Sequence, residues 1–151
     1  MANYTSIDKV RIESGFENNE VADWIIETAI KRANSEINSS IAARYSLPLS
    51  ANNCWEDSPA QGLLESIELL LASGYLLIQE YWVDSVNTDK DGYHKRDIAK
   101  NQIKEIIEGN LKLICEDGQE MEKGNKSNAG TIGVKWSPKS LERDFRITDK
   151  F

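Results

Sequence analysis

The chain has 151 residues, 40% hydrophobic and 28% charged, with a formal net charge of −7. This length fits one domain with a substantial hydrophobic core. The acidic balance argues against a general nucleic-acid binder, because such a protein needs a basic face to replace the counterions of the phosphates. Residues 1–4 lack the basic start and apolar run of a signal peptide, so we expect no leader.

Cysteine usage and hydropathy predict a reduced, cytosolic chain that does not cross a membrane. Cys54 and Cys115 lie far apart in the sequence and do not form the closely spaced pair of a metal site, so we expect both to be reduced. The most apolar stretch, residues 63–82, is interrupted by polar side chains, namely Glu65, Glu68, Gln79 and Glu80. It predicts a buried core helix and not a membrane span.

The first predicted helix is short and runs from Thr5 to Ser14. Thr5 can cap it, and Asp8 lies near the positive end of the helix dipole. Gly15 follows as a natural left-handed terminator. A helix of this length needs to pack against another element to persist.

A long second helix is predicted from Asn18 or Asn19 to Tyr45. Apolar residues recur along one face at steps of three and four, at Ile26, Ile30, Ala33, Ile37, Ile41 and Tyr45. The helix has to stop near Tyr45, because Pro48 disfavours helical geometry at Leu47. The stretch IAARYSLPLS therefore ends a helix on Arg-Tyr and continues as a Leu-Pro-Leu elbow.

The third predicted helix begins with the start signal SPAQ, in which Ser58 caps the helix and Gln61 can reach back as in a capping box. It runs to Trp82 or Val83. Its leucines, isoleucines and aromatic residues wrap more than half of its circumference, so we expect other helices around it. Gly74 in its middle costs about 1 kcal/mol relative to alanine, and this predicts a closely packed partner there.

Residues 84–93 are predicted to be a polar turn, and a last amphipathic helix follows over residues 93–113. Its apolar stripe consists of Ala99, Ile103, Ile106 or Ile107, Leu111 and Ile114. The sequence therefore predicts an all-α fold, a small bundle of about four helices over residues 1–115.

Composition changes after this bundle domain, and residues 116–151 are predicted to be a flexible linker and a C-terminal docking arm. Residues 118–133 have no apolar period and are rich in Gly, Asn and Lys, and residues 134–136 could pair as a short strand. Residues 123–151 hold seven basic and three acidic side chains, a net charge of about +4, against about −11 for the rest of the chain. A cationic arm with aromatic residues favours docking on another surface; the alternative is a frayed terminus.

The sequence contains no catalytic or metal-binding motif. His94, the single histidine, is predicted to be a surface residue. The aspartates of the predicted turn lack the spacing of a calcium loop: Asp84, Asp89 and Asp91. Glu65 and Glu68 lie on one helix face, but the Glu-x-x-His pairs of a di-metal bundle are missing, so we expect both to face solvent or another subunit. Phosphate-binding and dinucleotide fingerprints are also missing, so we expect no enzyme, no metal and no cofactor.

Two short motifs point to a family. ARYSLPL, residues 43–49, closes the long helix, and SPKSLERDF, residues 137–145, lies near the end of the chain. Together with the order of the helices, these motifs resemble the phage Gp36-like family, also called the Mu-like head-tail connector or head completion family, over roughly residues 4–114. The chain departs from the family in its long loop at 50–57 and in a central helix that holds no Lys or Arg from 59 to 83.

The resemblance implies a structural virion protein of a tailed phage or prophage. Such connectors lie at the head-tail interface of the virion, and in the host cytoplasm during assembly. They form a ring with copies of themselves, usually dodecameric, below the portal protein and join the head to a tail or stopper protein. Packaged DNA passes through their channel without sequence-specific binding, and no membrane is involved. An alternative from another class is a small helical regulatory or binding domain that acts on a single cellular protein partner.

Two interpretations of the elbow stay open. In the first, Tyr45, Leu47 and Leu49 pack over the core while Arg44 caps carbonyl groups at the helix end. In the second, the elbow presents Arg44 and Tyr45 to the portal or to a neighbouring subunit, because Arg and Tyr are good interface anchors. The residues predicted to make protein interfaces are Arg44, Tyr45, Trp136, Lys139, Arg143, Phe145 and Arg146.

Overall fold

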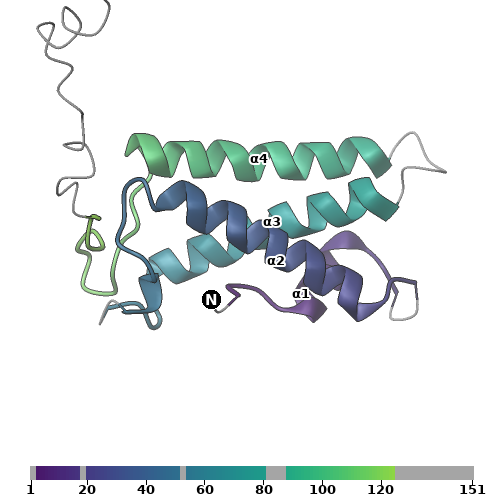
Figure 1. Ribbon diagram of the computed structural model, residues 1–151, viewed down its shortest axis with the longest axis horizontal. Helices are drawn as coiled ribbons and strands as arrows, with labels where there is room; N and C mark the ends of the chain where they lie inside the picture. Colours follow the sequence, from purple (N-terminus) through teal and green to yellow (C-terminus); the bar gives the residue numbers. More distant parts are fainter. Residues whose placement is uncertain (1–2, 18–19, 52–53, 81–87, 125–151) are drawn as a thin grey trace, which may run out of the picture.

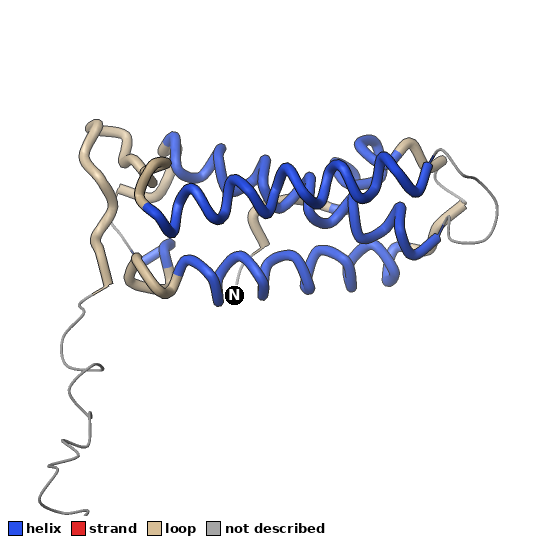
Figure 2. The backbone as a smooth tube through the Cα atoms, turned by 90° about the horizontal axis from the view of Figure 1, so that it is seen from above, coloured by secondary structure: helices blue, strands red, loops and turns tan. Residues whose placement is uncertain are grey.

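The computed structural model describes residues 3–17, 20–51, 54–80 and 88–124. They form the α-helices α1 (Ile7–Ser14), α2 (Asp23–Ile41), α3 (Pro59–Glu80) and α4 (Thr88–Glu108), and one short 3-10 helix, η1 (Leu49–Ala51). These described residues contain no strand (Figure 2). Helices α2, α3 and α4 lie lengthwise side by side, and α1 lies near the start of α2 (Figure 1). The predicted small all-α bundle is confirmed, and the predicted C-terminal arm lies outside the described residues.

Helix α3 is the centre of the bundle, because it contacts α1, α2 and α4. Its fully buried side chains include Leu64, Ile67, Leu71 and Leu76. By length and composition α3 is also the one helix among the described residues that could cross a membrane, and half of its apolar window is buried inside the bundle. Its packing against three other helices is the arrangement of the predicted core helix.

Helix α1 has the predicted stop and a different cap. Gly15 follows Ser14 at a φ of 75°, in the left-handed region that glycine favours. At the start of the helix, the hydroxyl of Ser6 accepts the N–H of Lys9 at 3.4 Å, so Ser6 caps the helix and the prediction for Thr5 is wrong. The N–H of Thr5 has another partner, a carboxylate of α3.

That carboxylate is Glu68, which is fully buried, so the expectation that it faces solvent or another subunit is wrong. It accepts hydrogen bonds from the N–H of Thr5 at 2.5 Å and from the side-chain amide of Asn34 in α2 at 2.8 Å. Burial raises the pKa of Glu68, and these donors oppose the shift. Glu68 therefore joins the N-terminal segment, α2 and α3. Glu65, one turn earlier, remains partly exposed and pairs with Lys9.

Helix α2 is shorter than predicted at both ends: it begins at Asp23 instead of residue 18 or 19, and it ends at Ile41 instead of Tyr45. Arg11 explains the later start. Its buried guanidinium donates to the carbonyl oxygen of Val21 over 2.9 Å and pairs with the carboxylate of Asp23. Because this side chain holds the carbonyl of Val21, the backbone stays extended at Ala22 and turns helical after it. A long-range contact, and not a local start signal, fixes this boundary.

Helix α4 begins at Thr88, inside the stretch predicted to be a polar turn, and ends at Glu108 instead of Leu113. Gly109 ends it, with a φ of 89° and an N–H that donates to the carbonyl oxygen of Glu105 over 3.0 Å. A glycine in the left-handed conformation after the last turn is a common helix stop. The apolar residues beyond it belong to a separate segment.

Two glycines bring α3 and α4 together. A methyl group added to Gly74 would lie 2.9 Å from the carbonyl oxygen of Gly92 and 3.0 Å from the backbone nitrogen of Arg96. One added to Gly92 would lie 3.0 Å from Cβ of Leu77. The close packing partner predicted for Gly74 is therefore confirmed, and it is a glycine of α4.

Gly74→Ala is expected to lower the free energy of unfolding by about 1–3 kcal/mol, because the added methyl group forces two closely packed backbones apart. Gly62→Ala is the matched control on the same helix, where an added methyl group meets no atom within 4 Å. It should raise stability by up to about 1 kcal/mol, since alanine favours a helix. Chemical denaturation followed by circular dichroism measures both changes. Equal effects of the two substitutions would contradict the close crossing.

Candidate protein-interaction site

The candidate site lies at the end of the bundle where the elbow after α2 meets the chain returning from α4 (Figure 1). The returning chain forms a tight hairpin. The N–H of Met121 donates to the carbonyl oxygen of Leu113 over 2.8 Å, and the N–H of Cys115 donates to that of Gln119 over 2.7 Å. The side chains of Leu113, Cys115 and Met121 are buried, so the hairpin is part of the folded body.

After the hairpin the chain runs antiparallel to the elbow. The N–H of Ser46 donates to the carbonyl oxygen of Glu122 over 3.2 Å, and the N–H of Gly124 donates to that of Arg44 over 3.0 Å. The predicted linker begins at residue 116, but Glu120, Glu122 and Gly124 within it contact the elbow. The rest of the predicted linker and the arm lie outside the described residues.

Tyr45 joins the elbow to the hairpin through its hydroxyl group. The residue is 1% exposed. Its hydroxyl donates to the Glu120 carboxylate over 3.0 Å and accepts the backbone N–H of Leu113 at 3.2 Å. It also accepts a longer bond of 3.3 Å from Nε of Arg44. A buried hydroxyl with these partners fixes the position of the hairpin relative to the end of α2.

Glu120 is the electrostatic centre of the site. Its carboxylate lies 2.9 Å from a guanidinium nitrogen of Arg44 and 3.1 Å from Nζ of Lys123. The hydrogen bond from Arg44, with smaller contributions from Lys123 and Tyr45, lowers the pKa of Glu120 to about 2. The same pairing raises the pKa of Arg44. Glu120 therefore stays ionised, and the site holds a fixed pair of opposite charges.

Arg44 is also fixed by Gly109. A methyl group added to Gly109 would lie 2.3 Å from Nη1 of Arg44, so the guanidinium packs where a larger residue would have its Cβ. The glycine therefore does two things: it ends α4 at a positive φ, and it leaves room for the side chain that binds Glu120.

These contacts test the two interpretations of the elbow residue by residue. Tyr45 and Leu49 are buried and Leu47 packs against the core, as the first interpretation expects. The prediction that Tyr45 is presented to a partner is wrong, because its ring and hydroxyl are used inside the chain. Within the part of the chain that the structure describes, Arg44 pairs with Glu120 and caps no carbonyl group. Its side chain is 20% exposed, and it stays a predicted interface residue.

The remaining predicted interface residues lie outside the described residues, so their positions stay predictions: Trp136, Lys139, Arg143, Phe145 and Arg146.

A disulfide bond between Cys54 and Cys115 overturns the expectation of reduced cysteines. The two Cα atoms lie 5.2 Å apart, within the ordinary range for a bridge. Next to it, the N–H of Ala60 at the start of α3 donates to the carbonyl oxygen of Ile114 over 3.1 Å. The sequence pattern could not predict this pairing, because Cys115 reaches the loop before α3 only through the hairpin after α4.

Sequence reasoning missed Glu120, because it lies in a polar stretch without periodicity. The available signal was Met121, an apolar residue inside that stretch, which the structure buries. Among the residues that the structure describes, no group of three or more His, Cys, Asp or Glu side chains could hold a metal ion. His94 is exposed, as predicted.

Residues 4–131 match the family described as Bacteriophage Mu, Gp36. The chain belongs to the Gp36 family. The match confirms the resemblance and extends through all four helices, the elbow and the hairpin with Glu120. As a Gp36 family member the protein is phage-associated. No curated protein and no solved structure matches the chain.

The low pKa of Glu120 predicts how the stability of this Gp36 family member changes in acid. A carboxylate whose pKa is lowered from 4.5 to about 2 on folding contributes stability above pH 4.5, and that contribution is lost as the pH falls toward 2. Glu120→Gln should therefore be less stable than the natural protein at pH 7 and equally stable near pH 2, in urea denaturation over this range. Glu116→Gln, at an exposed position of the same hairpin, is the control. A stability difference for Glu120→Gln that persists unchanged to pH 2 would contradict this account.

Proposed function

We propose that this Gp36 family member is a structural virion protein with no catalytic role. It acts as a head-tail connector, an adaptor or head completion protein, in a ring below the portal of a tailed phage or prophage. The observation that carries the proposal is the family match over residues 4–131. The location that follows is the head-tail interface of the virion.

The charge distribution supports assembly into a ring. Residues 123–151 carry a net charge of about +4 and the preceding part of the chain about −11. In a ring of identical subunits each contact joins two different faces, so one chain has to supply both complementary surfaces. An acidic body and a basic C-terminal segment meet this requirement.

The fold supports a role as a rigid adaptor. The hairpin that precedes the basic segment is held to the elbow by Tyr45, Arg44 and Glu120, and to the loop before α3 by a disulfide bond. The C-terminal segment therefore leaves the bundle from a fixed point beside Gly124. Its partners in this proposal are the portal protein, a tail or stopper protein and neighbouring copies. An acidic channel wall would repel the packaged DNA and let it slide.

Light scattering on a sizing column, with the protein mixed with its cognate portal oligomer, tests the proposal. We expect co-migration with about a dozen copies added to one portal ring. A triple variant with Lys139→Glu, Arg143→Glu and Arg146→Glu should lose this binding, because the basic segment would no longer complement an acidic surface.

The matched control carries the same charge change at exposed lysines of the bundle, Lys31→Glu, Lys100→Glu and Lys104→Glu. It should still bind, since these lysines make exposed ion pairs with carboxylates of the bundle, and such pairs contribute little to stability. If both variants lost portal binding equally, the loss would result from the overall charge and not from the basic segment. A natural protein that does not bind the portal would contradict the connector role and favour a regulatory domain with a cellular partner.

A further inference from the structure

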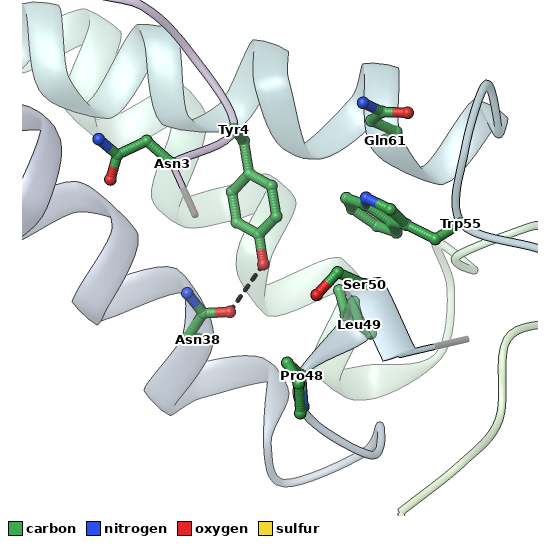
Figure 3. Close-up of a pocket in the computed structure, with 8 residues that line it drawn as sticks. All are labelled: Asn3, Tyr4, Asn38, Pro48, Leu49, Ser50, Trp55 and Gln61. Carbon is green, nitrogen blue, oxygen red and sulfur yellow. Dashed lines mark hydrogen bonds between the residues drawn. The ribbon is translucent and has the colours of Figure 1, made fainter. Parts of the chain in front are cut away.

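A pocket of about 180 Å³ lies between the N-terminal segment, the end of α2 and the loop before α3 (Figure 3). Its walls are mainly apolar and come from Tyr4, Trp55, Pro48 and Leu49. The rings of Tyr4 and Trp55 form a tilted pair with centroids 5.7 Å apart. A cavity of about 150 Å³ holds a benzene-sized ring, so this pocket can take most of one aromatic side chain.

Polar groups surround these apolar walls. Asn38, Ser50 and Gln61 contribute to the lining (Figure 3). The hydroxyl of Tyr4 donates to Oδ1 of Asn38 over 2.7 Å, and burial raises the pKa of Tyr4 to about 12, so the phenol stays neutral. An apolar floor with hydrogen-bonding groups at its edge suits an amphipathic ring such as indole, which carries one N–H donor.

We propose that this pocket binds the side chain of Trp136 from the same chain. The inference concerns the free subunit and does not depend on ring formation. It gives the C-terminal segment a docking position on its own bundle.

The first argument is reach. The chain passes Gly124 beside Ser46, and Pro48 and Leu49 of the pocket follow Ser46 by only two and three residues. Two or three extended residues span at most about 7–11 Å, whereas the twelve residues from Gly124 to Trp136 reach up to about 40 Å. The segment is therefore long enough, and its tethering gives it a high effective concentration at the pocket.

The second argument is charge. Glu56 and Asp57 follow Trp55 directly and are both exposed. The N–H of Asp57 donates to Oε1 of the lining residue Gln61 over 3.1 Å, so this acidic pair lies on the backbone segment that borders the pocket. In the C-terminal segment Lys135 and Lys139 flank the tryptophan, in the sequence KWSPK.

The third argument is the choice of aromatic residue. Phe145 and Phe151 lie farther along the segment, and phenylalanine has no donor for the polar edge of the pocket. Phe145 lies between Asp144 and Arg146, whereas Trp136 follows Lys135 and has no acidic residue within five positions, so its neighbourhood complements Glu56 and Asp57 better. Trp136 combines the donor with neighbouring cations and the shortest connection.

A competition experiment on the full chain tests the proposal. A fluorescein-labelled peptide of residues 132–141 is added to the natural protein and to Trp136→Ala, and fluorescence anisotropy measures its binding. Trp136→Ala, whose own segment cannot fill the pocket, should bind the peptide at least about tenfold more tightly than the natural protein, because the tethered segment competes in the natural chain. A peptide carrying Trp136→Ala should not bind.

The pocket itself is tested with Ser50→Trp in the Trp136→Ala background, which places a ring at an exposed edge position of the pocket. Peptide binding should be lost, with the helical circular dichroism spectrum unchanged. Binding that survives Ser50→Trp would overturn the assignment of the pocket. Equal affinity of the natural protein and Trp136→Ala would overturn occupation by the same chain, as would no binding to either.

Discussion

The hydrogen bonds of the Tyr45 hydroxyl determine how the two halves of the chain meet. Through them the turn after α2 contacts Glu120 and Leu113, more than 60 residues later in the sequence. Arg44 adds a charged bond to the same carboxylate, and Gly109 leaves the space for its guanidinium. Arg44 and Tyr45, in the turn after α2, thus form mainly an internal anchor.

This anchor has a consequence for assembly. The basic C-terminal segment begins where the anchored hairpin ends, so its origin on the bundle is fixed by Tyr45, Arg44, Glu120 and the disulfide bond. A fixed origin limits the positions that the segment can reach on a neighbour or on its own bundle. In the proposed connector role, the bundle supplies a rigid acidic body and the segment supplies the basic contact.

Local patterns predicted the parts of the fold that depend on neighbouring residues. Gly15 ends α1, and Ser58 caps α3 with its hydroxyl accepting the N–H of Gln61 at 3.2 Å. The patterns failed where residues distant in the sequence determine the local structure. Glu68 is buried because Thr5 and α2 supply its donors, and the cysteines pair because the hairpin returns. Single-sequence periodicity carries no information on such pairings.

The most direct test of the anchor is hydrogen exchange in Tyr45→Phe, which removes only the hydroxyl. The account predicts that amide protection falls in residues 113–124, by about tenfold for the loss of about 1–1.5 kcal/mol. Protection in the centres of α2, α3 and α4 should change much less, because the rest of the ring still fills the core. Unchanged protection of the hairpin, or an equal loss across the whole bundle, would contradict the claim that this hydroxyl anchors the hairpin to the elbow.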